Sequence, residues 1–293
     1  MSLPNDIVIL DKTHRDFPDF QVLHDPPERL YCLGDVSLLK TNCIAVVGTR
    51  RMTRYGRDVT ETLTADCVRN GLTVVSGMAR GVDTVAHETA LAKGGGTVAV
   101  LGSGFDHIYP AENADLFRRI AEKGLVLTEY EPGMPPLKHQ FPARNRIIAA
   151  LSLGVLVTEA GEKSGALITA YDALDQGREV FAVPGGIFSP ESAGTNRLIR
   201  AGHAHMVTSG ADIFRALGQD YVKNEKITAL QLDIEQEKVL NIVCKDGPLH
   251  LNGLIEKTGI ELQRLNSLLF TMELSGVIEK LPGNFYQAAV TNK

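Results

Sequence analysis

Basic, hydroxyl and glycine residues follow several short apolar segments of this chain, and together they suit anion binding. Glycine lets backbone N–H groups approach a ligand closely, while arginine and lysine bind phosphate oxygens through charge-assisted hydrogen bonds. The residues with this chemistry are Gly48, Thr49, Arg50, Lys138, Arg144, Arg146, Ser164 and Thr169. They predict an extended site for an anion of polyphosphate size, in which Ser164 and Thr169 hold neighbouring phosphates.

Phe141 follows Lys138 by three positions, and this neighbour narrows the class of anion. A cation beside an exposed aromatic ring fits single-stranded nucleic acid, because the phosphate binds the charge while a base stacks on the ring. A structural role is the alternative for Phe141, since the ring can anchor the core ahead of Pro142.

Two of the arginines also have a structural alternative. Arg144 and Arg146 can pair with carboxylates such as Glu159 or Glu129, and for Arg146 we favour this pairing over ligand contact. For Arg50 a structural role fits less well, because it comes directly after a Gly-Thr turn at the end of an apolar segment. A guanidinium in that place is expected to face the ligand.

The elements that position these residues alternate between short strands and helices. Continuous apolar strands in such an alternation are typical of a parallel, doubly wound α/β sheet. The predicted strands are 44–47, 72–75, 97–101, 125–128, 154–158, 179–183 and 204–207. The predicted helices are 55–69, 82–92, 113–122, 144–152, 165–175 and 195–201. Ligands of such sheets bind outside the carboxyl ends of the strands, where the glycine-rich and basic stretches lie.

Four segments follow from the pattern along the chain. Residues 1–43 are expected to form a lead-in with one or two extra strands, 44–217 an extended Rossmann-like domain, and 218–232 a polar linker. Residues 233–293 contain three helices and a hairpin, the pattern of a winged helix. Its third helix, 261–275, carries one Arg and two Glu, so we expect this domain to contact protein rather than read duplex DNA.

The net charge of −5 argues weakly against nucleic acid, but the charge is unevenly distributed. When the charges of 1–43, 44–150, 151–232 and 233–293 are counted separately, only 44–150 has more Lys and Arg than Asp and Glu, 13 against 11. A local basic patch there can attract phosphate. No apolar run approaches the roughly 18 residues of a membrane helix. The cysteines are scattered without the spacing of disulfides or zinc ligands, and the N-terminus has no signal-peptide pattern. We therefore expect a cytoplasmic protein without membrane contact.

Standard nucleotide-binding and catalytic motifs are missing from the sequence. The chain has no G-x-x-x-x-G-K-[ST] phosphate loop, no G-x-G-x-x-G dinucleotide motif and no H-E-x-x-H zinc motif. It also lacks the G-x-S-x-G turn of a serine hydrolase. We therefore expect a non-enzymatic protein without a cofactor, a metal ion or catalytic residues.

The motifs, in their order along the chain, resemble the DNA-processing protein A family, also called DprA or Smf. The matching stretches are 47–50 (VGTR), 76–83 (SGMARGVD), 138–148 (KHQFPARNRII), 164–170 (SGALITA), 181–185 (FAVPG) and 195–199 (TNRLI). The resemblance implies an extended Rossmann fold that binds single-stranded DNA without sequence preference, with Arg50 and Lys138 in the pocket and Phe141 as the neighbouring aromatic. It also implies a homodimer that loads the recombinase RecA onto DNA during natural transformation, with single-strand-binding protein as a further partner.

Two other functions stay open at this point. Nucleotide-processing enzymes of the lysine-decarboxylase-like group hydrolyse N-glycosidic bonds with a PGG-x-GT-x-x-E loop, and Pro184-Gly185-Gly186 begins in the same way. However, Ile187-Phe188-Ser189 follows, and no pair of carboxylates stands in a catalytic arrangement. The other alternative is a scaffold that uses its winged helix for protein contacts alone.

Overall fold

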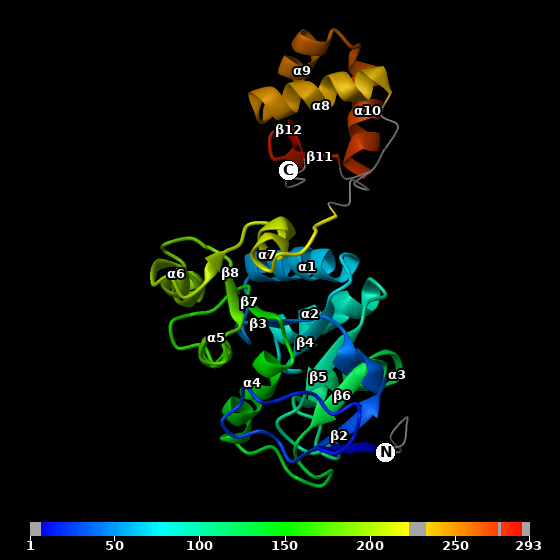
Figure 1. Ribbon diagram of the computed structural model, residues 1–293. Helices are drawn as coiled ribbons and strands as arrows, with labels where there is room; N and C mark the ends of the chain where they lie inside the picture. Colours follow the sequence, from blue (N-terminus) through cyan, green and yellow to red (C-terminus); the bar gives the residue numbers. More distant parts are fainter. Residues whose placement is uncertain (1–6, 223–232, 275–276, 289–293) are drawn as a thin grey trace. The chain divides into compact units, whose positions relative to one another are not determined.

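The computed structural model of the protein describes residues 7–222, 233–274 and 277–288, which form two compact units (Figure 1). The first unit is Met1–Lys223 and the second is Asn224–Lys293. Residues 223–232, which make up most of the predicted linker, lie outside the described residues.

A nine-stranded sheet forms the centre of the first unit. Its strands are β1 (Val8–Asp11), β2 (Arg29–Gly34), β3 (Cys43–Val47), β4 (Thr73–Ser76), β5 (Thr97–Val100), β6 (Leu125–Thr128), β7 (Gly154–Val157), β8 (Glu179–Ala182) and β9 (His205–Met206). Across the sheet their order is β1-β2-β6-β5-β4-β3-β7-β8-β9. Strand β2 is antiparallel to both β1 and β6, and the other neighbouring pairs are parallel. The predicted doubly wound, mostly parallel sheet is confirmed.

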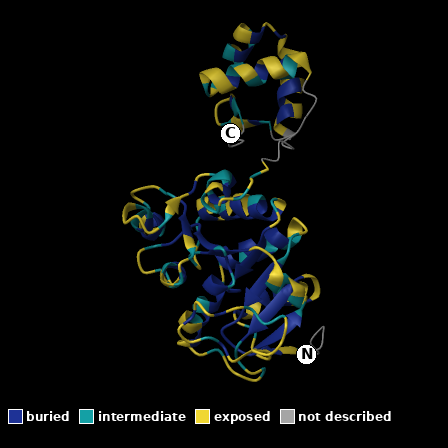
Figure 2. Cartoon of the chain, viewed as in Figure 1, coloured by how far each residue is buried: buried dark blue, intermediate teal, exposed yellow. Residues whose placement is uncertain are grey.

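Helices cover both faces of this sheet. On one face lie α1 (Arg54–Arg69), α2 (Val82–Ala92), α3 (Ala114–Lys123) and α7 (Gly210–Ala216); on the other lie α4 (Gln140–Ala150), α5 (Ala166–Asp175) and α6 (Ala193–Arg200). Ala45 and Val47 of β3 pack toward α4 and α5, whereas Ile44 and Val46 pack toward α1 and α2. Because both faces are covered, the strands β3 to β7 are mostly apolar and fully buried, and they appear as the buried centre in Figure 2. Among the described residues, no helix has the length and apolar character needed to cross a membrane.

One helix differs from its prediction, and it carries site residues. The stretch before residue 144 was expected as a loop, which is wrong, because α4 already begins at Gln140. Pro142 occupies its third position, where proline is tolerated because the N–H groups of the first turn have no acceptor within the helix. Phe141 and Arg144 therefore project from one helix, three residues apart.

The second unit has the helices and hairpin of a winged helix. Its elements are α8 (Ile234–Asp246), β10 (Leu249–His250), α9 (Leu251–Thr258), α10 (Leu262–Leu274), β11 (Ile278–Leu281) and β12 (Phe285–Ala288). Asp233 and Gln236 begin α8 with a reciprocal capping box. Strand β12 pairs with both β10 and β11, and Val239, Leu265 and Met272 lie in a core that belongs to this unit. The predicted winged-helix architecture is confirmed.

A buried histidine gives the first unit a pH dependence. Nδ1 of His87 lies 2.7 Å from the hydroxyl of Thr97, and that hydroxyl donates to the carbonyl of Val74. Thr97 therefore accepts a hydrogen bond from Nδ1, while Nε2 is buried without a partner. Burial lowers the pKa of His87 to about 3, from an ordinary value of 6.5. Neutral His87 makes its full contribution to the free energy of unfolding above its ordinary pKa, and this contribution is lost as the pH falls toward the lowered pKa.

We expect His87 to reduce the free energy of unfolding by up to about 1.4 kcal/mol per pH unit on acidification below about pH 6. Chemical denaturation of the wild type and of His87→Gln at several pH values between about 7 and 4 measures this slope. Burial raises the pKa of Asp83 to about 6, so Asp83 changes the free energy of unfolding with pH in the opposite direction. This contribution is present in both proteins and cancels when their slopes are compared. Identical slopes in the two proteins would refute the assignment to His87.

Candidate nucleic-acid interface

The strand order reverses at β3, and a cleft opens at the carboxyl ends of β3 and β7. From β3 the chain continues through β4, β5 and β6 on one side of the sheet, and through β7, β8 and β9 on the other. Such a reversal separates the loops that follow two adjacent parallel strands, which makes it the usual ligand site of doubly wound sheets. Here the two loops are 48–53 and 158–165.

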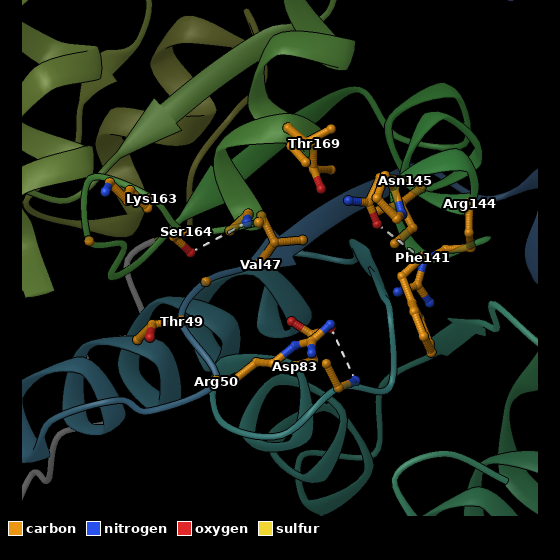
Figure 3. Close-up of a pocket in the computed structure, with 18 of the residues that line it drawn as sticks. Val47, Thr49, Arg50, Asp83, Phe141, Arg144, Asn145, Lys163, Ser164 and Thr169 are labelled. Atoms are coloured by element: carbon orange, nitrogen blue, oxygen red, sulfur yellow. Dashed lines mark hydrogen bonds between the residues drawn. The ribbon is translucent and has the colours of Figure 1, made fainter. Parts of the chain in front are cut away.

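The cleft has a volume of about 780 Å³, in the range of about 300–1,000 Å³ that is typical of ligand sites. The predicted site residues that line it are Gly48, Thr49, Arg50, Lys138, Phe141, Arg144, Ser164 and Thr169. Figure 3 shows Arg50 between the loop that carries Lys163 and the helix that carries Phe141. The structure therefore brings together residues from three separate stretches of the chain.

Glu159 fixes the loop that presents Arg50. The N–H of Thr49 donates to the Glu159 carbonyl at 2.7 Å, and the buried carboxylate accepts from the N–H and the hydroxyl of Thr53 at 2.8 and 2.6 Å. Gly81, with φ of 77°, lies so close that a Cβ would stand 2.3 Å from the Thr49 carbonyl oxygen. Only glycine fits there, and the loop is held from both sides.

Arg144 is a structural residue of the opposite wall. Its side chain is only 4% exposed, and Nη1 donates to the carbonyl of Gly77 at 2.7 Å and to that of Val100. These bonds join the loop that follows β4 to the carboxyl end of β5. Asp83, 6% exposed, lies beside the guanidinium and accepts from the N–H groups of Gly77 and Ala79 at 3.1 and 3.2 Å.

Burial dominates the electrostatics of this pair. It raises the pKa of Asp83 to about 6, although the charge of Arg144 acts in the opposite direction. Burial also lowers the pKa of Arg144 to about 10, against the attraction of Asp83. The carboxylate beside Arg144 is therefore Asp83, not Glu129 or Glu159. Because its Nη1 donates to two backbone carbonyls, we propose a structural role for Arg144 in place of a ligand contact.

Arg146 does not line the cleft. Its Nη2 lies 2.6 Å from the Glu129 carboxylate and 3.9 Å from that of Asp25, and the guanidinium is largely buried. A pairing with a carboxylate such as Glu159 or Glu129 was the alternative favoured from the sequence, and the structure has the one with Glu129. We therefore leave Arg146 out of the proposed DNA contacts below.

The N-terminus of α5 closes the third side of the cleft. Gly165 is the N-cap and offers no side-chain cap, and the N–H of Ala166 lies 3.4 Å from the hydroxyl of Ser164. The partial positive charge of a helix N-terminus favours an anion at this position. Thr169 lies one turn further along, buried but lining the cleft.

Four cations on the cleft have no ion pair with any described residue: Arg50, Arg51, Lys138 and Lys163. Among the described lining residues, Asp83 is the one carboxylate, and Arg144 offsets its charge. The cleft therefore has an excess of positive charge, although the chain as a whole has a net charge of −5.

Sequence reasoning missed several of the residues that line the cleft, among them Lys163, Arg51 and Tyr109. Lys163 and Arg51 stand in loops that were expected at this edge, so their position was a usable signal. Tyr109 gave no signal, because it lies in a long irregular stretch between β5 and α3. The structure places it beside Phe141.

The segment that suggested a nucleotide hydrolase has a structural role. Asn196 binds both backbone groups of Gly185, accepting from its N–H at 3.1 Å and donating to its carbonyl at 3.0 Å. Pro184, Gly185 and Gly186 are not among the described residues that line the cleft. No structural observation therefore favours the hydrolase alternative.

Comparison with known proteins identifies a family over most of the chain. The family model described as DNA recombination-mediator protein A matches residues 8–218, and that of the DprA winged helix domain matches 223–284. DNA processing protein DprA of Bacillus subtilis is 46% identical, over 69% of this chain and 68% of its own length. Protein Smf of Escherichia coli is 36% identical, over 92% of this chain and 74% of its own length.

Solved structures agree with this result. DprA from Streptococcus pneumoniae has a TM-score of 0.69 at 44% identity, over 71% of this chain and 74% of that one. DprA from Helicobacter pylori, reported for its single-stranded DNA binding mode, has a TM-score of 0.66 at 38% identity, over 74% of this chain and 97% of that one. This chain therefore belongs to the DNA recombination-mediator protein A family, which includes DNA processing proteins named DprA and Smf.

Proposed function

We propose that this chain binds single-stranded DNA, without sequence preference, in the cleft at β3 and β7. The observation that carries the proposal is a set of four cations around one cleft that form no ion pair with a described residue: Arg50, Arg51, Lys138 and Lys163. Backbone phosphates are common to every sequence, so binding through them is independent of sequence. Ser164, Thr169 and the N-terminus of α5 hold neighbouring phosphates. The similarity to H. pylori DprA supports this choice of ligand.

Titration of labelled oligo-dT at several salt concentrations tests the proposal. Each phosphate contact contributes about −0.7 to the slope of log Kobs against log salt, so four contacts give a slope near −2.8. Competition by unlabelled oligonucleotides of other sequences is expected to be about equally effective. Absence of binding, or binding that salt does not weaken, would contradict the proposal.

We further propose that a homodimer of this chain loads RecA onto the bound strand in the cytoplasm, during DNA uptake and recombination. The proposal is supported by the family description, which names recombination mediation, and by the sequence resemblance. We propose single-strand-binding protein as a further partner in this loading. Addition of the protein to RecA and DNA coated with single-strand-binding protein is expected to shorten the lag in RecA ATP hydrolysis. An unchanged lag at saturating protein would count against loading.

For the winged helix we propose a protein-contact or accessory role. Arg264 is the one cation of α10, and its guanidinium is paired with Glu235 at 2.8 Å and lies 3.8 Å from Asp233. A helix that reads duplex DNA usually offers free basic side chains to the groove, and α10 does not. Submicromolar, salt-sensitive DNA binding by an isolated 230–293 fragment would overturn this assignment.

A further inference from the structure

The ring of Phe141 is already covered by other groups of the protein. Its centroid lies 5.3 Å from that of Tyr109, with 44° between the ring planes, and Cζ of Arg50 lies 5.8 Å from the Phe141 centroid. A Cβ on Gly102 would stand 2.9 Å from Cδ1 of Phe141, so the ring also packs on the backbone there. With three neighbours around it, Phe141 offers a base little free surface.

Tyr109 is the aromatic side chain of the cleft that remains open. It is 44% exposed and lines both the main cleft and a small recess beside it, which Arg80 and Pro110 also line. Within the described part of the chain, its ring contacts that of Phe141 and its hydroxyl has no hydrogen bond. A tyrosine supplies a large, rigid contact surface with a polar end, which suits a nucleobase.

The stretch that carries Tyr109 is held in place before any ligand binds. The hydroxyl of Ser103 donates to the carbonyl of His107 at 2.9 Å, two residues before the tyrosine. On the other side, the buried amide of Asn113 donates to the carbonyl of Met78 at 2.9 Å. Tyr109 therefore lies between two anchored points, which lowers the entropy that a base contact costs.

We propose that Tyr109 stacks against a nucleobase of the bound strand, while Phe141 supports the tyrosine ring and Arg50 binds a phosphate beside it. The inference rests on the proposed function, because it assigns the base contact of the same cleft. It also separates two contributions to affinity. The contribution of Arg50 needs only a phosphate, whereas that of Tyr109 needs a base.

Binding of the full chain to oligo-dT and to an abasic oligonucleotide of equal length tests this inference. For Tyr109→Ala we expect affinity for oligo-dT to fall on the order of tenfold, with affinity for the abasic strand and the salt slope unchanged. Tyr109→Phe is expected to retain the wild-type affinity for oligo-dT, because it keeps the ring. Tyr55→Ala is the control, since Tyr55 is 45% exposed but does not line the cleft.

Two results would overturn the role of Tyr109. One is that Tyr109→Ala binds oligo-dT as tightly as Tyr55→Ala does; the other is an equal loss of affinity for both strands, which indicates a general structural effect. Failure of the proposed function looks different, because the wild type would then bind neither strand. The two failures are therefore distinguishable in one set of titrations.

Discussion

The double variant Arg50→Ala/Lys138→Ala is expected to bind oligo-dT roughly 100-fold or more weakly than the wild type, since each charge-assisted hydrogen bond contributes about 1.5–3 kcal/mol. The slope of log Kobs against log salt should also become shallower by about 1.4, which corresponds to two phosphate contacts. Both residues line the cleft, and neither forms an ion pair with a described residue. Their removal therefore leaves no buried charge unpaired, and folding should be unaffected.

Arg118→Ala/Lys123→Ala provides a matched control for the double variant. It removes the same charge from α3, whose residues do not line the cleft. We expect the control to change affinity only slightly, through the long-range field, and to leave the salt slope almost unchanged. If the two double variants lose affinity to the same extent, the cleft is not the site and net charge alone governs binding.

Arg144→Met is expected to destabilise the first unit by about 3–5 kcal/mol, which is the usual result of removing one partner from a buried ionic cluster. The change leaves the carbonyls of Gly77 and Val100 without their donor and leaves the buried carboxylate of Asp83 without its neighbouring cation. Methionine retains much of the volume, so the loss is mainly electrostatic and not a cavity effect. Urea denaturation near neutral pH measures the difference.

Arg146→Met is the comparison for this variant, because Arg146 lies on the same helix and pairs with Glu129, and both side chains are partly exposed. We expect its loss of stability to be clearly smaller, since its carboxylate partner retains some exposure to water. If Arg144→Met lowers the free energy of unfolding no more than Arg146→Met does, Arg144 is not the residue that stabilises this wall of the cleft. In that case Arg144 would return to the set of ligand contacts.

The strands and the edge that carries the cleft were predictable from the sequence for a physical reason. A parallel strand covered on both faces must be apolar throughout, as 44–47 and 154–157 are, and the next residues must then lie at the carboxyl edge. The residues after β3 could therefore be assigned to the ligand side before the structure was known.

The different roles of Lys138 and Arg144 were not predictable from the sequence. Lys138 and Arg144 stand in one basic stretch, yet Lys138 is exposed and Arg144 is buried, because α4 begins between them and turns Arg144 inward. Asp83, the carboxylate that interacts electrostatically with Arg144, comes from a different helix. Only the packing of α2 against the strands brings these two side chains together, and no local pattern records that contact.

A structure of the chain bound to oligo-dT is the most direct test of the central claim, that single-stranded DNA binds in the cleft at β3 and β7. We expect backbone phosphates within hydrogen-bonding distance of Arg50 and Lys138, with a further phosphate at the N-terminus of α5. DNA bound to the winged helix or to another surface, with the cleft free of DNA, would contradict the claim.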